Sequence, residues 1–260
     1  MYTYNLFQWI LLFYTYCFLG WCVESTIVST REKRFINRGF LKGPMLPIYG
    51  TGAILILFSS LPLKKYPILV YIAGLISTTI LEYFTGWLME TIFKIKYWDY
   101  TDDKFNYKGR ICLVSSLFWG VLTLFAVYVI HTPISNFVTS LSNITTIIIS
   151  IITSIIFVSD VIYSTYNVLG LNKLLGFMTG IKKEMENLSS QTKEKTPPTD
   201  SSTTKEKLSL LKLEYDKYSS KVNFFHKQII KSYPSASSKK FNDAFKALKN
   251  KIENTFYKKR

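Results

Sequence analysis

Cysteine and histidine are scarce in this sequence, which holds three cysteines and two histidines among 260 residues. The cysteines are Cys17, Cys22 and Cys112, and their spacing matches no metal-binding motif. We therefore expect small apolar packing residues at these positions and no metal site. The sequence also lacks a phosphate-binding loop of the form GxxxxGKS or GxxxxGKT and any nucleophile motif. We expect no bound cofactor, no ATP hydrolysis by this chain and no enzymatic activity.

Positive charge is sparse in the first two thirds of the chain and abundant afterwards. Residues 1–167 carry a formal net charge of +4, whereas residues 168–260 carry +11 of the total of +15. An apolar block is thus followed by a basic, polar tail. We predict a transmembrane domain over residues 1–167, a juxtamembrane segment and polar linker over 168–204, and a basic, coiled-coil-like helical hairpin over 205–260.

Lysine and arginine are absent from five apolar runs. These are residues 6–28, 47–61, 67–93, 111–130 and 143–166. A bilayer core about 30 Å thick requires roughly 20 helical residues, so the second run is long enough only if its helix begins at Gly43. No basic segment precedes the first run and no small-residue cleavage site follows it. We therefore interpret the first run as a retained span and not as a signal peptide.

The connections between these runs differ in basic residues. Loops 29–46 and 94–110 each hold five Lys or Arg residues, loop 62–66 holds two, and loop 131–142 holds none. Because cytoplasmic loops of membrane proteins carry the excess of Lys and Arg, we expect both rich loops and the C-terminal tail in the cytoplasm. The sequence therefore predicts a multi-pass protein of the cell membrane with its N-terminus outside.

Two short motifs recur at similar spacing. Residues 20–24 read GWCVE and residues 86–90 read GWLME, and each motif ends an apolar run and opens a basic loop. Each loop leads into a further span, marked PIYG at 47–50 and LFWG at 117–120. We interpret spans 1–2 and 3–4 as a tandem repeat related by an axis along the membrane normal. The predicted fold is an all-α polytopic membrane protein with five transmembrane helices and a C-terminal cytoplasmic helical hairpin.

Several of these motifs together resemble a known family. They are the two GWxxE motifs, NRGFLKGPMLPIYGTG at 37–52, LEYFTGWLMETIF at 81–93, WDY at 98–100 and NYKGRICL at 106–113. Over about residues 10–165 the chain resembles the bacterial membrane family called putative ABC-transporter type IV. The resemblance implies a membrane component of a transporter whose ATPase is a separate chain. Five spans are few for a permease, so we also expect a homodimer or another partner.

Acidic residues in or near the spans are the first candidates for a substrate or ion pathway. Glu82 lies near the middle of the third span, where a charge costs about 2.5–3.5 kcal/mol. Without a basic residue in any span, Glu82 must be protonated or solvated by polar groups. It is therefore either a proton- or cation-linked site or a hydrogen-bonded structural carboxyl. Asp160 lies in the fifth span, and its neighbour Ser159 could satisfy it locally.

Glu24 and Glu90 close the two GWxxE motifs, and Arg38 and Arg110 follow them in the basic loops. We expect Glu–Arg pairs at the inner face of the membrane, with a structural role or as a gate or polar-headgroup site. Asp99 could pair with Arg110 or Arg38.

The Gly/Pro-rich stretch after the first basic loop also belongs to the candidate pathway. We predict a turn at Gly43 and Pro44 and a helix beginning near Pro47, because proline is tolerated in the first turn of a helix. Such a helix start is either a tight re-entry turn or an anion-favouring site. Asn37 and Asn106 occupy similar places in the two repeat loops.

The tail contains two amphipathic stretches. Apolar residues alternate at steps of three and four from Leu208 to Ile229, and a second stripe runs from Phe241 to Phe256. We expect an antiparallel hairpin that packs on itself, with dimerisation or docking to a partner as the alternative. Its positive charge could also hold it on anionic lipid, and we expect no nucleic-acid binding.

Three classes of function fit these observations. The first is a transporter component, for which the cargo is open. The second is a non-transporting scaffold or regulator that acts through the cytoplasmic tail, and the third is an intramembrane enzyme that acts on lipid.

Overall fold

The computed structural model describes residues 4–194 and 201–257 of the chain, and it is mostly helical. Within these residues, four helical stretches are long and apolar enough to cross a membrane. They are Leu6–Glu32, Pro67–Phe93, Leu113–Ser140 and Asn143–Ser190. The apolar helix Pro47–Leu63 is shorter. The chain is therefore a multi-pass membrane protein with four full-length candidate spans and one short apolar helix.

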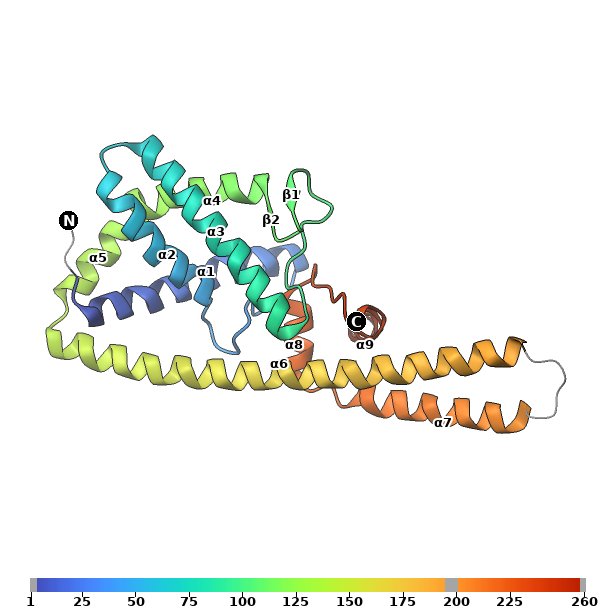
Figure 1. Ribbon diagram of the computed structural model, residues 1–260. Helices are drawn as coiled ribbons and strands as arrows, with labels where there is room; N and C mark the ends of the chain where they lie inside the picture. The colour runs from blue at the N-terminus through green and yellow to red at the C-terminus, as the bar shows by residue number, and fades with distance from the viewer. Residues whose placement is uncertain (1–3, 195–200, 258–260) are drawn as a thin grey trace.

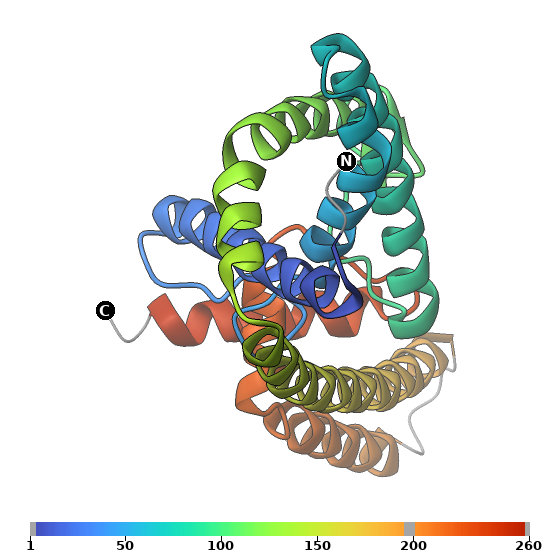
Figure 2. The same cartoon turned by 90° about the vertical axis from the view of Figure 1, so that its left-hand side faces the viewer.

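The short helix α2 (Pro47–Ser60) begins where the sequence predicts, with proline in its first turn, and continues into the 3₁₀ turn η1 (Leu61–Leu63). It packs against α1 (Leu6–Glu32) on one side and α3 (Pro67–Phe93) on the other. Figure 2 shows α2 within the arc formed by α3, α4 and α5, while α1 crosses this arc and extends beyond α5. A Cβ atom on Gly50 would lie 2.4 Å from the Cys17 Sγ atom, so α1 and α2 approach each other closely at this glycine.

The fourth span is longer than predicted. α4 (Leu113–Phe125) continues through a π-helical turn (Ala126–Ile130) into α5 (His131–Ser140). The predicted span ended at Ile130, but the turn that follows remains helical and His131 is fully buried. α4 packs along α3, and a Cβ atom on Gly120 would lie 2.5 Å from the Tyr71 ring of α3.

The loop before α4 contains a small antiparallel hairpin of β1 (Asn106–Tyr107) and β2 (Ile111–Cys112). Tyr107 and Ile111 are Cα partners in its register. The connecting turn holds Lys108 and Gly109 at φ angles of 54° and 63°. Two consecutive positive φ angles are typical of the tight turns that connect hairpin strands.

The fifth predicted span, residues 143–166, is only the first part of a much longer helix. α6 (Asn143–Glu194) has 52 residues, which corresponds to about 78 Å at 1.5 Å per residue. Figure 1 shows α6 extending along the whole length of the molecule, with α7 (Ser201–Ser220) returning beside its far end. The Lys207 and Glu184 side chains form an ion pair of 3.4 Å between these two helices.

The predicted tail hairpin differs from the observed arrangement. The apolar seam from Leu208 to Ile229 is interrupted after Ser220, because Asn223 caps a new helix, α8 (Phe224–Ser232). Of the predicted linker 188–204, the residues before and after 195–200 are helical, and 195–200 lie outside the described residues. The helices that pair as antiparallel neighbours are α6 and α7, and not the two amphipathic stretches of the tail.

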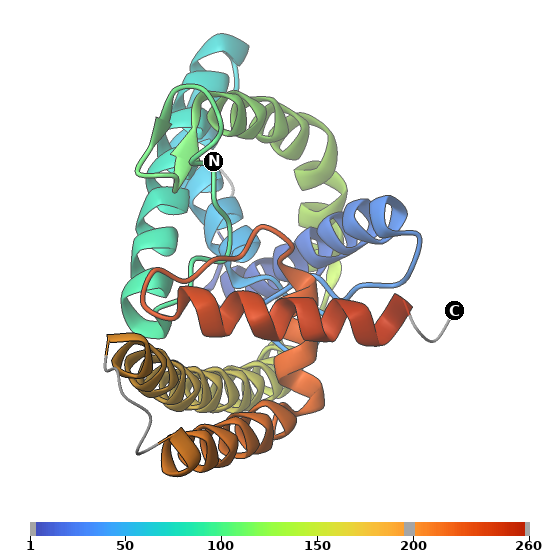
Figure 3. The ribbon, with the colours of Figure 1, turned by 90° about the vertical axis from the view of Figure 1, so that its right-hand side faces the viewer.

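The two amphipathic stretches instead share a core with α6. The buried side chains of α8 and α9 (Asn242–Tyr257) pack on the part of α6 that follows its apolar stretch and on the segment after α3. The contributing residues include Phe225, Ile229, Phe245, Leu248, Leu171, Leu175, Ile95 and Tyr97. Figure 3 shows α9 lying across the end of the helical bundle. The Phe256 side chain of the predicted stripe lies outside the described side chains.

An acid-lined cavity as the candidate functional site

A cavity of about 170 Å³ lies between the two pairs of apolar helices. Its walls come from α1, α2, α3 and α4, from both basic loops and from the segment that follows α8. Glu24, Arg38 and Glu82 line it, together with residues that the sequence analysis did not single out. These are mainly aromatic: Tyr49, Trp98, Tyr100, Phe118, Trp119 and Tyr233.

Glu82 is buried on α3 and accepts hydrogen bonds from three neutral donors. The Tyr100 hydroxyl donates to its Oε1 atom at 3.1 Å, and Trp119 Nε1 donates to its Oε2 atom at 3.1 Å. The Ser115 hydroxyl lies within 3.0 Å of both oxygens. None of the ion pairs among the described residues involves Glu82. Its charge is therefore compensated by dipoles alone, which makes its protonation state sensitive to what occupies the cavity.

Glu24 lines the same cavity from α1 and has different partners. The Tyr49 hydroxyl donates to its Oε1 atom at 2.7 Å, and Arg38 Nε donates to its Oε2 atom at 3.4 Å. Tyr49 is the tyrosine of the PIYG motif and Trp119 is the tryptophan of LFWG. Equivalent aromatic positions therefore serve different carboxylates, one on α1 and one on α3.

Arg38 connects the cavity to the C-terminal part of the chain. Its guanidinium lies 4.4 Å from the centroid of the Tyr233 ring, and Nη1 donates to the Ser232 carbonyl. The Ser232 hydroxyl in turn donates to the Asn37 carbonyl. The Asn37 side chain holds its own loop, accepting from Trp21 Nε1 at 2.6 Å and donating to the Lys42 carbonyl at 2.7 Å. The segment after α8 thus closes the loop side of the cavity.

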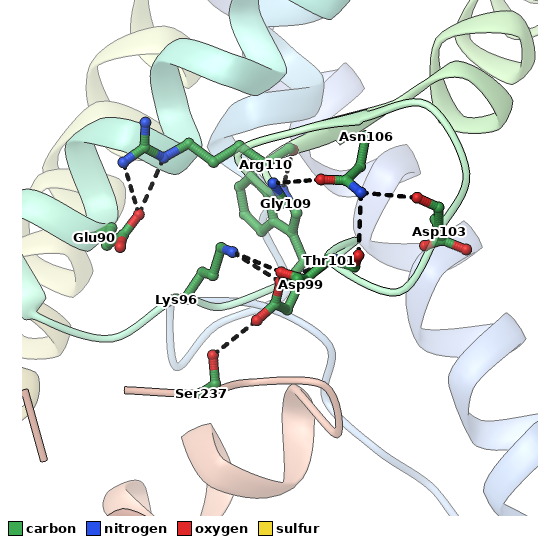
Figure 4. Close-up of polar contacts among 10 residues, drawn as sticks. Glu90, Lys96, Asp99, Thr101, Asp103, Asn106, Gly109, Arg110 and Ser237 are labelled. Carbon is green, nitrogen blue, oxygen red and sulfur yellow. Dashed lines mark hydrogen bonds and ion pairs between the residues drawn. The ribbon is translucent and has the colours of Figure 1, made fainter. Parts of the chain in front are cut away.

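The second Glu–Arg pair also forms, but outside this cavity. Arg110 donates to the Glu90 Oε2 atom from Nη2 at 2.8 Å and from Nε at 3.0 Å, as Figure 4 shows. The Arg110 carbonyl accepts from Trp98 Nε1 at 2.9 Å. The expected pairing of Glu24 with Arg38 and of Glu90 with Arg110 is therefore present, although only the first pair reaches the cavity.

The sequence suggested that Asp99 pairs with Arg110 or Arg38, but Asp99 has a different partner. Its partner is Lys96, whose Nζ lies 2.8 Å from Oδ1, and the Ser237 hydroxyl donates to Oδ2 at 3.1 Å. Figure 4 shows these contacts joining the loop to the C-terminal segment. Burial alone would raise the pKa of Asp99, but hydrogen bonds from Lys96 and Thr101 outweigh it and hold the pKa below its usual value.

Asn106 braces the same loop. Its amide nitrogen donates to the Thr101 and Asp103 carbonyls at 3.1 and 2.8 Å, and its oxygen accepts from the Gly109 amide at 3.1 Å. Figure 4 shows that Asn106 lies across the loop from the Lys96–Asp99 pair. Its contacts are all within the loop, so they shape the backbone that carries Trp98 and Tyr100 to the cavity.

Asp160 forms a third polar cluster, on α6. Its two oxygens accept from the backbone amides of Lys42 and Gly43 at 3.1 and 2.7 Å, and from the Ser164 hydroxyl at 3.0 Å. Ser159, the partner that the sequence suggested, donates instead to the carbonyl of Ile155 in its own helix. Asp160 therefore fixes the Gly43–Pro44 turn against α6, and this turn leads into Pro47 and the start of α2.

The structure thus divides the twelve candidates into groups. Glu24, Arg38 and Glu82 meet at the cavity, while the others support the loops around it. In residues 4–194 and 201–257, no group of three or more His, Cys, Asp or Glu side chains is arranged to hold a metal ion. The aromatic donors were not among the candidates because their hydrogen bonds to the carboxylates depend on how the helices pack. In the sequence, only the repeated aromatic–glycine pairs of PIYG and LFWG pointed to them.

Long apolar helices around a buried, acid-lined cavity define a multi-pass helical membrane protein. The model of the family described as "Putative ABC-transporter type IV" matches residues 11–165, from α1 to the first part of α6. The chain belongs to this family, and the resemblance seen in its motifs is confirmed. Searches of curated proteins and of solved structures returned no match.

Proposed function

We propose that the chain is the non-enzymatic membrane component of an ABC-type transporter, with ATP hydrolysis supplied by a separate chain. Family membership supports a transporter-type membrane protein. The observation that carries the proposal is the cavity in which Glu24 and Glu82, from different helices, face the same space. Acidic residues among spans are costly and usually mark a substrate or ion path. In this proposal the cavity is part of that path.

The proposed topology has five spans with the N-terminus outside and the C-terminus in the cytoplasm. α2 and η1 cover 17 residues between them, which is near the lower limit for a spanning helix. The preceding Gly43–Pro44 segment extends it. The excess of Lys and Arg in loops 29–46 and 94–110 supports the orientation. Reporter fusions after Asn167 should report cytoplasm, and fusions at Ser142, in the turn between α5 and α6, should report the exterior; the reverse pattern would contradict the topology.

We also propose that α1–α2 and α3–α4 are the two units of a tandem repeat. Each unit has a Glu–Arg pair, Glu24–Arg38 at 3.4 Å and Glu90–Arg110 at 2.8 Å. Each unit also has a glycine at a close helix contact, Gly50 or Gly120. A site between two related units is the arrangement in which transporters with repeats bind their substrates.

The helix α7, which lies beyond the candidate spans, carries an exposed apolar surface that is suited to binding a partner. On α7, Leu210 and Leu213 are 59% and 67% exposed. Exposed apolar residues on a helix that projects from the bundle favour docking to another chain, either the ATPase or a second copy of this chain. The same observation favours the second candidate function, a scaffold or regulator that acts through its cytoplasmic tail.

The test combines co-purification with reconstitution. We expect the full-length chain, purified from its native host with mild detergent, to retain an ATPase subunit. In proteoliposomes, the two chains together should hydrolyse ATP faster than the ATPase alone. A signalling or envelope protein in place of the ATPase would favour the scaffold. Lipid turnover by the purified chain without any partner would favour the lipid-acting enzyme.

A further inference from the structure

The helix α8 lies at the level where α6 leaves its apolar stretch. The His226 Nε2 atom lies 2.9 Å from the Asn167 carbonyl, and Asn223 Nδ2 donates to Asn167 Oδ1 at 3.0 Å. The Phe225 ring lies 5.7 Å from the ring of Tyr163, the residue one turn earlier on α6. Figures 1 and 3 show α8 running across the direction of α6. α8 therefore lies along the boundary between the spans and the cytoplasmic helices.

The other end of α8 meets the loop that follows α1. Ser232 contacts Asn37 there, and the candidate span α1 ends at Glu32, two residues before Arg34. Within α8, Phe225, Ile229 and Ile230 are buried against the bundle, whereas Phe224 and Lys227 are exposed on the other face. The outer face of α8 therefore presents a basic and an aromatic side chain, Lys227 and Phe224, two kinds of residue with which membrane-surface helices contact lipid.

A groove of about 590 Å³ lies between α8 and the segment after α1. Its lining includes three basic side chains, Arg34, Lys227 and Lys231, and none of its described lining residues is acidic. Glu32 lies 3.5 Å from Arg34 outside the lining, and since both side chains are partly exposed their pairing is weak. The groove therefore keeps a positive potential.

Two further features of the groove point to an anionic ligand. Burial, together with the positive charges of Arg34 and Lys227, lowers the pKa of Lys231 to about 8. These cations are thus close enough to repel one another, and an anion between them would relieve that repulsion. The amide nitrogen of Gln228, another lining residue, is buried with no hydrogen-bond partner among the described residues. Phosphate oxygens are acceptors for all four groups.

Phe35 and Phe224, at the edges of the groove, are 75% and 78% exposed. Exposed aromatic rings beside a basic groove are unfavourable in water but suited to the headgroup region of a bilayer. We propose that this groove binds the phosphate headgroup of an anionic phospholipid of the adjoining leaflet, with Phe35 and Phe224 inserted among the lipids around it. This site is separate from the acid-lined cavity and does not depend on transport.

The test compares lipid binding by the full-length protein and by a Lys227→Gln, Lys231→Gln double variant. Both are purified in a non-ionic detergent, and bound phosphatidylglycerol and phosphatidylcholine are counted by native mass spectrometry during titration. We expect the wild type to bind phosphatidylglycerol preferentially. We expect the double variant to bind it about 30-fold more weakly, since each basic residue near an anionic surface contributes about 1 kcal/mol.

The matched control is the Lys212→Gln, Lys217→Gln variant, which removes the same charge from exposed positions on α7. It should bind phosphatidylglycerol like the wild type, and an equal loss in this control would overturn the assigned site. The single variant Lys227→Gln, at an exposed position, tests the site without disturbing the fold and should bind about fivefold more weakly. Equal binding of both lipids by the wild type, or full displacement of phosphatidylglycerol by inorganic phosphate at equal concentration, would also refute the lipid site.

Discussion

The rings of Tyr49 and Trp119 lie 5.4 Å apart, and each donates a hydrogen bond to a different carboxylate of the cavity. Tyr49 comes from α2 and holds Glu24, while Trp119 comes from α4 and holds Glu82. The ring contact places the hydrogen-bond donors of the two carboxylates side by side. The contact also joins the two proposed repeat units at the motifs PIYG and LFWG.

The first prediction concerns Glu82. We expect Glu82→Gln to accumulate and fold like the wild type but to lose transport, because glutamine keeps the shape and some of the hydrogen bonds while removing the titrating group. The glutamine oxygen can accept from Trp119 Nε1 while its amide nitrogen donates to the hydroxyl oxygen of Tyr100, so rotation of the amide and of the hydroxyls preserves these contacts. Folding is followed by fluorescence-detected gel filtration, and function by transport or growth across a range of pH.

The control for this substitution is Glu186→Gln, which removes a carboxylate from an exposed position on α6, where its ion pair with Lys182 at 3.8 Å is weak. The control should remain active. A Glu82→Gln variant with full activity at every pH would show that the carboxyl is structural and would shift the interpretation from transport toward a scaffold.

The second prediction uses Gly50 and Gly120, the glycines of the PIYG and LFWG motifs, which lie at close helix contacts. At Gly50 an added Cβ atom would lie 2.7 Å from the backbone oxygen of Phe13, whereas at Gly120 it would meet only the Tyr71 side chain. Because a ring can move more easily than a backbone, we expect Gly50→Ala to destabilise more than Gly120→Ala. Overpacking of this kind costs about 1–3 kcal/mol. Thermal unfolding in detergent measures the difference.

Gly180 on α6 provides the control, because no atom lies within 4 Å of a Cβ atom placed there. Alanine is favoured over glycine inside a helix by about 1 kcal/mol, so Gly180→Ala should raise stability slightly. If Gly50→Ala unfolded no earlier than Gly180→Ala, close packing of α1 on α2 would not be a source of stability.

The third prediction is a pH dependence at α8. The His226 Nδ1 atom lies 3.4 Å from the Asn223 amide and Nε2 lies 2.9 Å from the Asn167 carbonyl, an arrangement that fits a neutral ring protonated on Nε2. Burial lowers the pKa of His226 from its ordinary value of 6.5, although the hydrogen bond to Asn167 acts in the opposite direction. Its contribution to stability is therefore present above pH 6.5 and is lost as the pH falls.

Hydrogen exchange of the α8 amides measures this effect in the full-length protein without a histidine tag. Between pH 7.5 and 5, after correction for intrinsic exchange, protection of α8 should fall in the wild type. In His226→Gln, which can still donate to Asn167 but does not titrate, protection should stay constant. A parallel fall in both proteins would mean that another group controls the attachment of α8.

Local features of the sequence predicted a good part of the structure. The start of α2 at Pro47 follows from backbone chemistry, and each Glu–Arg pair joins the last part of a helix to the loop that follows it. The prediction ended the fifth span near Tyr166 because the apolar pattern ends there. The helix α6 itself continues, since the polar residues that follow are still compatible with a helix. The break at Asn223 was missed because an uninterrupted apolar seam hid a helix cap.

Contacts between distant segments could not be predicted in this way. His131, the residue after the predicted fourth span, is buried and lies 3.0 Å from the Tyr16 hydroxyl and 3.1 Å from the Tyr4 hydroxyl. The partners of Glu82 come from the loop after α3 and from α4. Such pairs depend on how the helices pack, and residue spacing carries no information about them.

The last prediction concerns Asp160, whose oxygens accept the backbone amides of Lys42 and Gly43. Replacement by alanine leaves the Gly43 amide without its acceptor and the Lys42 amide with only the Ser164 hydroxyl at 3.2 Å, and an unsatisfied donor away from water costs about 1–3 kcal/mol. Asp160→Asn should have a thermal stability between those of the wild type and Asp160→Ala, because its single oxygen can accept only some of the hydrogen bonds. Ser159→Ala should be neutral, since Ser159 bonds only within its own helix. Thermal unfolding of the three variants gives their order of stability. If Ser159→Ala lowered the stability as much as Asp160→Ala does, the turn would not be held by the aspartate.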